Sequence, residues 1–197
     1  ENGFNICGTT DSIDADVSGL HISPVLPALL SGGWVVNPGS VGHIQWQRCL
    51  GGTYFDYGRD LKITADSGYI LAEDVWSNDG DVTNFHGQDD YWLVKVDQSG
   101  NIVWSKTFGA SSDDNPGCCT QTTDGGFIIA GASDYNFGGF HGPPLSQDMG
   151  VVKVNATGNT EWSKCYGGTS GEYPYSIIPA DNGGFYIVSE NSSNDGD

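Results

Sequence analysis

The sequence predicts an all-β fold made of tandem four-stranded antiparallel meanders, β-propeller-like and partial or open, with incomplete repeats at both ends. A tryptophan recurs at an interval of 58 residues (104 − 46 and 162 − 104), at Trp46, Trp104 and Trp162, and its neighbours recur with it. Such an interval indicates one supersecondary unit copied in tandem. Short β-branched and aromatic runs between Gly, Asn and Asp clusters favour strands, and no segment has the sustained period of a capped helix.

Each copy opens with a glycine-containing pair and a polar loop that holds an acidic residue at one register. These acids are Asp56, Asp114 and Glu172. A short segment follows, residues 61–64 in the second copy, and it runs into the turn Asp66-Ser67-Gly68. Asp or Asn followed by Gly favours hairpin turns, because Gly takes positive φ without steric cost.

The rest of each copy supplies three more strands. An apolar run begins with an aromatic residue, over residues 69–72 in the second copy, and a longer loop leads to a third run over 91–96. A short turn at residues 98–101 then returns the chain to the tryptophan strand. Copies of such a meander suggest propeller blades. A two-sheet sandwich is the alternative, but that fold does not require near-identical units.

We expect a single β-repeat domain over residues 1–197. Its parts are a partial repeat at 1–52 with an insertion at 20–33, complete repeats at 53–110 and 111–168, and a partial repeat at 169–197. Closed propellers have about four to eight blades, and this chain holds fewer. The expectation is therefore a piece of a longer array or a protomer that a neighbour completes.

The charge of the chain restricts its partners. The net charge is −18, with only seven Lys and Arg residues. Nucleic acid is excluded as a partner, because phosphate neutralisation needs a basic face, and no stretch is long and apolar enough for membrane insertion. Strong acidity is typical of solubility in an extracellular milieu or of divalent-cation binding, and the two are compatible.

Alternating Asp residues on the loop after the second strand form a candidate Ca²⁺ site. Asp79 and Asp81 lie there in the second copy, and Asp14 and Asp16 lie there in the first. Ca²⁺ prefers six to eight oxygen ligands, which carboxylates on an irregular loop can supply. The alternative is that these side chains cap backbone amides in a turn.

Other residues suggest chemistry but recur in several copies, as scaffold parts do. His21, His86 and His141 share one register, and each is expected to hydrogen-bond a nearby Asp. The acids at the start of each copy are interpreted either as glycosidase carboxylates, which need separations of about 5–10 Å, or as groups that fix loops by hydrogen bonds. Enzymatic activity is the less favoured interpretation, and no catalytic residue is assigned.

Aromatic residues around the same loop are candidate platforms for a sugar ring. They are Trp76, Phe85 and Tyr91. Core packing is the alternative for each of them.

The motifs of the second and third copies resemble a known class of repeat. They are Ser-Asn-Asp-Gly-Asp-Val at 77–82, Asp-Tyr-Trp-Leu-Val-Lys-Val-Asp at 90–97, Gly-Asn-Ile-Val-Trp-Ser-Lys at 100–106 and Thr-Thr-Asp-Gly-Gly-Phe-Ile at 122–128. This pattern resembles the tandem β-propeller-type repeats of large secreted or cell-surface proteins of Bacteroidetes-type bacteria. The resemblance implies a surface, adhesive or carbohydrate-related role.

The expected function is that of an extracellular structural or adhesive β-repeat protein, self-assembling into a filament or forming part of a larger surface protein. Its partners would be further copies of itself or another surface protein. The alternative is a carbohydrate-binding or glycoside-active propeller whose partner is a polysaccharide.

Overall fold

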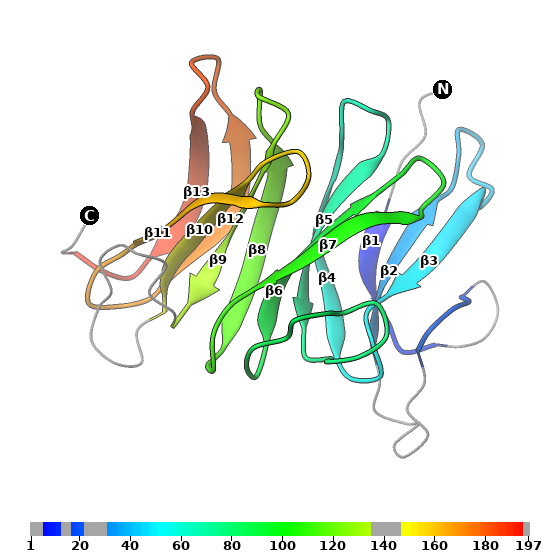
Figure 1. Ribbon diagram of the computed structural model, residues 1–197, viewed down its shortest axis with the longest axis horizontal. Helices are drawn as coiled ribbons and strands as arrows, with labels where there is room; N and C mark the ends of the chain where they lie inside the picture. Colours follow the sequence, from blue (N-terminus) through cyan, green and yellow to red (C-terminus); the bar gives the residue numbers. More distant parts are fainter. Residues whose placement is uncertain (1–5, 13–16, 22–30, 135–146, 195–197) are drawn as a thin grey trace.

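The computed structural model describes residues 6–12, 17–21, 31–134 and 147–194. Within these ranges the chain forms thirteen β-strands and no helix. The strands make four antiparallel sheets that follow one another across the molecule in chain order (Figure 1). The predicted all-β fold of open, propeller-like meanders is confirmed.

Two of the sheets are complete meanders. The first contains β4 (Asp56–Ile63), β5 (Tyr69–Val75), β6 (Asp90–Val96) and β7 (Ile102–Phe108). The second contains β8 (Asp114–Gln121), β9 (Phe127–Ser133), β10 (Asp148–Val154) and β11 (Thr160–Tyr166). The first strands lie close together, because β4 contacts β8 and β8 contacts β12 (Glu172–Pro179).

The remaining two sheets hold parts of the same unit. Strands β1 (Ile6–Thr10), β2 (Gly32–Asn37) and β3 (Trp46–Leu50) correspond to the last three strands of a repeat. Strands β12 and β13 (Phe185–Asn191) correspond to the first two. The predicted insertion at 20–33 overlaps the start of β2, and its residues 22–30 lie outside the described part of the chain.

The first strand of each repeat is longer than the sequence predicted. It begins at the recurring acid, at Asp56 rather than at residue 61. The reason is that the first strand pairs with the second strand along this whole length, from Asp56 opposite Val75 onward. Its first residue is also held by the preceding repeat, because the Asp56 amide donates to the Ser31 carbonyl over 2.8 Å and the Glu172 amide donates to the Gln147 carbonyl over 2.8 Å.

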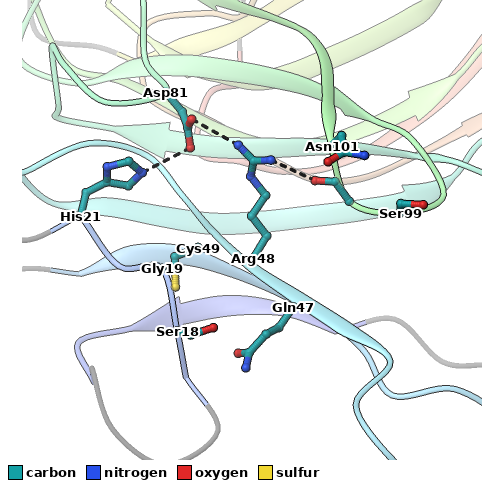
Figure 2. Close-up of a pocket in the computed structure, with 10 residues that line it drawn as sticks. Ser18, Gly19, His21, Gln47, Arg48, Cys49, Asp81, Ser99 and Asn101 are labelled. Atoms are coloured by element: carbon teal, nitrogen blue, oxygen red, sulfur yellow. Dashed lines mark hydrogen bonds and ion pairs between the residues drawn. The ribbon is translucent and has the colours of Figure 1, made fainter.

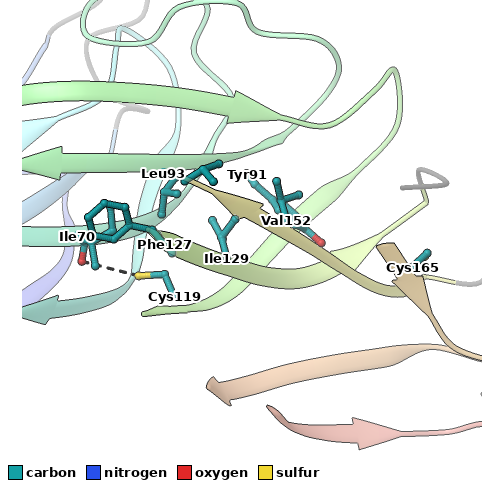
Figure 3. Packing of buried hydrophobic residues seen from close by; sticks show 10 residues of the cluster. Ile70, Tyr91, Leu93, Cys119, Phe127, Ile129, Val152 and Cys165 are labelled. Carbon is teal, nitrogen blue, oxygen red and sulfur yellow. Dashed lines mark hydrogen bonds between the residues drawn. The ribbon is translucent and has the colours of Figure 1, made fainter. Parts of the chain in front are cut away.

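The core consists of apolar layers between successive sheets. Figure 3 shows the layer between the two complete meanders, where Ile70 and Leu93 meet Phe127, Ile129 and Val152. Alternate residues of β5 and β9 point to opposite neighbours, so both strands are buried along their whole length. Burial on two faces explains why these strands are continuous apolar runs rather than alternating ones.

The recurring tryptophan contacts the next repeat. Each one lies on a fourth strand and packs against the aromatic residue that opens the second strand of the following sheet. The ring centroids are 5.6 Å apart for Trp46 and Tyr69, 5.5 Å for Trp104 and Phe127, and 5.9 Å for Trp162 and Phe185. Aromatic pairs at such distances add about 0.5–1.5 kcal/mol beyond their area burial.

Two of these tryptophans also cover a glycine in the next repeat's turn between third and fourth strands. A Cβ added to Gly100 would lie 2.8 Å from the Trp46 ring, and one added to Gly158 would lie 2.9 Å from the Trp104 ring. Both glycines have positive φ, +82° and +79°. Glycine is therefore required there twice, for the turn and for the close approach of the ring.

A buried lysine fastens the turn between first and second strands. Lys95 donates to the carbonyl of the next residue over 3.0 Å and to Asp66 Oδ1 over 3.1 Å. Lys153 makes the equivalent contacts with the next carbonyl and with Asp124, at 3.2 Å and 3.1 Å. A Cβ on Gly68 would lie 2.5 Å from the Lys95 ammonium, so the glycine also makes room for the lysine.

Each of the first two interfaces between sheets pairs a large side chain with a glycine. The large side chain comes from the later sheet in the first interface and from the earlier sheet in the second. Between the first two sheets Glu73 of β5 lies over Gly33 of β2, where a Cβ would collide with the carboxyl group. Between the next two, Tyr91 of β6 lies over Gly131 of β9, where a Cβ would be 2.7 Å from the ring. The interfaces are thus built alike but are not interchangeable, since swapping one partner alone leaves a clash or a void.

In the part of the chain that the structure describes, there is no helix with the length and apolarity needed to cross a membrane.

The substitution Trp104→Ala is expected to destabilise the protein by about 2–4 kcal/mol, because it removes the contacts with both Phe127 and Gly158. Trp162→Ala is the matched control, since Trp162 contacts Phe185 but covers no glycine among the described residues, and it should cost about half as much. Urea unfolding followed by fluorescence and circular dichroism measures both. An equal or larger loss from Trp162→Ala would contradict the role given to the glycine contact.

Candidate functional site

The recurring acids fix the loops at the start of each repeat. Asp56 Oδ2 accepts hydrogen bonds from the Gly52 amide and the Ser77 hydroxyl, both over 2.7 Å. Asp56 is fully buried, and burial raises its pKa to about 6. Its carboxylate therefore joins the end of one repeat to the loop after the second strand of the next.

The other two copies make the same link. Asp114 accepts from the Ala110 amide over 2.8 Å and from the Ser133 hydroxyl. Glu172 accepts from the Gly168 amide over 3.3 Å and from the Ser193 hydroxyl over 2.5 Å. Of the two interpretations of these acids, loop-fixing hydrogen bonds match the geometry.

The loop histidines have carboxylate partners. His86 Nδ1 lies 3.0 Å from Asp90 Oδ2, and the His86 amide donates to the same oxygen over 2.8 Å, as predicted. His21 instead lies 3.4 Å from Asp81, in the next repeat. His141 is outside the described residues.

The two candidate calcium ligands face different partners. Asp79 accepts from the Thr53 amide and hydroxyl, both over 2.7 Å, and these bonds lower its pKa. Asp81 accepts from Arg48 over 3.3 Å. Asp79 thus caps a loop, the alternative left open by the sequence, and a cation at Asp81 would have to compete with a guanidinium.

Asp14 and Asp16 lie outside the described residues. Among residues 6–12, 17–21, 31–134 and 147–194, no group of three or more His, Cys, Asp or Glu side chains could hold a metal ion. Calcium binding stays a prediction.

The three candidate aromatic platforms differ in exposure. Trp76 is 40% exposed and contacts Phe55, with ring centroids 6.5 Å apart. Phe85 is half-buried and packs against the core between the first two sheets. Tyr91 is completely buried over Gly131. This corrects the prediction for Tyr91, because a ring that fills an interface presents no face to a ligand.

A polar cavity of about 390 Å³ lies between β3 and the second repeat. Figure 2 shows Arg48 at its centre, between Asp81 and the carbonyl of Gly100, to which it donates over 3.3 Å. His21 approaches the same Asp81 from the other side (Figure 2). The charges in this cavity are already paired with one another, so it joins repeats rather than presenting a free charge.

A second concavity crosses the first strands of three repeats. Its volume is about 350 Å³. It is lined by Arg59, Asn115, Pro116, Gly117, Ala132, Gln147, Tyr173, Pro174 and Tyr175. We call it the first-strand groove.

A β-bulge at one register shapes this groove. The pairing of each first strand with its second strand shifts at one place, which leaves one residue of β4, β8 and β12 without a pairing partner. These residues are Arg59, Gly117 and Tyr175. Bulges re-aim side chains and are over-represented next to binding sites, and here they give the groove a guanidinium, an open position and a phenol.

Tyrosines dominate one end of the first-strand groove. Tyr173 and Tyr175 are 39% and 62% exposed. The Tyr175 hydroxyl donates to Glu190 over 2.7 Å. This hydrogen bond holds the ring in place and raises the pKa of Tyr175. The amide side chains of Asn115 and Gln147 line the groove beside them.

The other end of the groove holds a fixed arginine. Arg59 donates to Asp74 over 2.6 Å and lies 5.6 Å above the Tyr57 ring. Burial, and then the charges of Asp74 and Asp113, raise the pKa of the neighbouring Asp89 to about 7. The guanidinium keeps further N–H groups for hydrogen bonds with a ligand, since it has five in all.

Sequence reasoning missed this groove. The signal lay in one register with a spacing of 58 residues, which holds Arg59, Gly117 and Tyr175 in the three copies. Sequence alternation assigns successive residues of a strand to opposite faces of the sheet. A bulge interrupts this alternation, so a reader of the sequence who does not know its position cannot assign these three residues to a face.

No protein-family model matches the chain, and the search of curated proteins found no match. Among solved structures, the chain is similar to a protein of unknown function from Bacteroides caccae, with a TM-score of 0.48 and 14% sequence identity. The match covers 84% of this chain and 54% of that one, so the chain spans about half of that protein's length. The resemblance to propeller-type surface repeats stays a prediction.

One buried acid lies at an interface without a partner. Both carboxyl oxygens of Glu73 lack a hydrogen-bond partner among the described residues. Burial, and then the charges of Asp56 and Asp81, raise its pKa to about 8. The carboxyl group is therefore mostly protonated at neutral pH, where an unfolded chain would have it ionised.

Glu73 should make the protein less stable as the pH rises. Its pKa is higher in the folded state than in the unfolded state, so the folded state binds more protons, and stability falls with pH until the folded group has ionised. Between about pH 6 and about pH 8 the loss should be about 2 kcal/mol. Glu73→Gln should remove this loss, as measured by urea unfolding at several pH values.

Asp56→Asn is the control for that experiment, because the pKa of Asp56 is about 6 and most of its effect lies at lower pH. Equal slopes for the wild-type protein and Glu73→Gln above about pH 6 would contradict the assignment.

Proposed function

We propose that this protein is an extracellular adhesive β-repeat protein that binds a neutral polysaccharide in the first-strand groove. The observation that carries the proposal is the row of exposed Tyr173 and Tyr175 beside Arg59, Asn115 and Gln147. Binding sites combine apolar and aromatic surface with a few polar groups that fix orientation. Tyrosine rings can stack on the faces of sugar rings, while amide and guanidinium groups hydrogen-bond hydroxyls.

The charge of the chain supports a neutral ligand rather than a polyanion. The net charge of −18 repels anionic polymers at low salt. Within the groove Arg59 is paired with Asp74, so it adds donors without adding much net positive charge.

An aromatic row supports a ligand longer than the groove itself. Arg59 lies over Tyr57, which stacks on Phe55 at 6.3 Å with nearly parallel rings, and Phe55 contacts the exposed Trp76. The sequence-predicted platform Trp76 thus lies at the far end of a row that starts in the groove. A chain of sugar units would extend along it.

Tyr175→Ala is expected to reduce binding to a neutral polysaccharide by roughly tenfold or more, since it removes the most exposed ring of the groove. The loss of one stacked ring is worth about 1–3 kcal/mol by analogy with stacking on bases. Affinity electrophoresis in gels containing β-glucan, xylan, mannan or starch measures the retardation.

Val103→Ala is the control, because Val103 is 59% exposed on β7 and does not line the groove. It should migrate like the wild-type protein in every gel. The proposal fails if no polysaccharide retards the wild-type protein, or if Tyr173→Ala and Tyr175→Ala leave retardation unchanged.

Calcium is a separate part of the proposal, supported by the overall acidity of the chain, and at Asp79 it would replace the hydrogen bonds from Thr53. Bound Ca²⁺ stabilises only the folded state, so EDTA should lower the Tm by about 2–4 °C for each kcal/mol of binding. Differential scanning calorimetry of the wild-type protein and of Asp79→Asn measures this. A Tm that EDTA leaves unchanged would rule out a structural cation.

A further inference from the structure

The last sheet exposes apolar side chains at registers that are buried in the two preceding repeats. Tyr186 and Val188 are 65% and 64% exposed. Their equivalents, 58 and 116 residues earlier, are fully buried. These equivalents are Ile128 and Ala130 in β9, and Ile70 and Ala72 in β5. We call the surface formed by Ile178, Tyr186 and Val188 the forward face.

The protein itself shows what covers a forward face. Ile70 and Ala72 lie against Phe127 and Ile129 of the next sheet. Ile128 packs in the cluster between the last two sheets. In both cases the cover is the opposite face of a following repeat. The forward face therefore has the apolar character of the faces that pack on a following sheet inside this protein.

The sheet at the other end of the molecule exposes part of the complementary face. Ile6 of β1 and Ile44, before β3, are 56% and 40% exposed, Trp34 of β2 is half-buried, and Val36, which pairs with Ile6, is buried. The residue equivalent to Ile6 is Leu71, which is fully buried between the first two sheets. We call the surface formed by Ile6, Trp34 and Ile44 the backward face.

The two faces lie at opposite ends of the row of sheets (Figure 1), so one copy cannot join its own faces. We propose that the forward face binds the backward face of a second copy of this chain, head to tail. The contact continues the stacking that the chain already uses between its own sheets. Large exposed apolar patches on soluble proteins mark such interaction sites, and a contact between unlike faces is heterologous.

The net charge sets the conditions for this association. Each copy carries −18, and two copies repel each other at low ionic strength. Salt screens that repulsion and strengthens apolar contact, so association should increase from about 0.05 M to about 0.5 M NaCl. An association held by salt bridges would show the opposite salt dependence, since salt would weaken it.

Analytical ultracentrifugation of the 197-residue chain tests the proposal. The wild-type protein should form species larger than a monomer, more so at higher salt and concentration. Val188→Lys and Ile6→Lys should each be monomers, because each lacks one of the two faces. Val103→Lys, which changes an equally exposed side chain on β7, should associate like the wild-type protein.

Mixing the two single variants is the decisive measurement. Ile6→Lys keeps its forward face and Val188→Lys keeps its backward face, so an equimolar mixture should form dimers and nothing larger. A monomeric wild-type protein would overturn the proposal, and so would a mixture that stays monomeric. Loss of association in Val188→Lys but not in Ile6→Lys would show a contact between two forward faces instead. None of these outcomes depends on polysaccharide binding, which is measured with Tyr175→Ala.

Discussion

The contact between each recurring tryptophan and the next repeat is the constraint on which the stack of sheets depends. The ring reaches from a fourth strand to the opening aromatic of a neighbouring second strand and, for Trp46 and Trp104, covers a glycine of the neighbouring turn. One side chain thereby sets both the spacing and the orientation of the next sheet. Its partners must recur at a fixed offset, which is the physical reason for the 58-residue interval.

Polar groups complete the junctions that the tryptophans establish. Each repeat starts with a buried carboxylate, that of Asp56, Asp114 or Glu172. It accepts hydrogen bonds from amides and hydroxyls of two repeats. Such groups are costly to bury and are tolerated because every junction gives them hydrogen-bond donors. Glu73 lacks such donors among the described residues. It fills the interface between the first two sheets, whereas the uncharged Tyr91 fills the interface between the next two. The strength of the first junction consequently falls as Glu73 ionises.

Function is proposed where the copies differ. The residues that recur bind repeats to one another, whereas the bulge register carries Arg59, Gly117 and Tyr175 in turn. A repeat protein gains a binding surface in this way without losing its packing, because the bulged residue leaves the ladder and faces the groove. The exposed faces of the first and last sheets have the opposite character, since they preserve the residues of a packed interface.

The sequence by itself determined the strands, the turns and the repeated unit. Periodicity is local, and Gly, Asp and aromatic residues at fixed offsets report it directly, as the turn at Asp66 and Gly68 illustrates. It also predicted the pairing of His86 with Asp90. The sequence left open whether an aromatic residue is a binding platform or part of the core. Trp76 and Tyr91 are both aromatic residues near the same loop, and the sequence alone does not distinguish their burial. Only the tertiary structure decided that Tyr91 is buried over Gly131, and that bulges bring Arg59 and Tyr175 from different repeats into one groove. Both outcomes depend on how sheets pack face to face, and no single repeat contains that information.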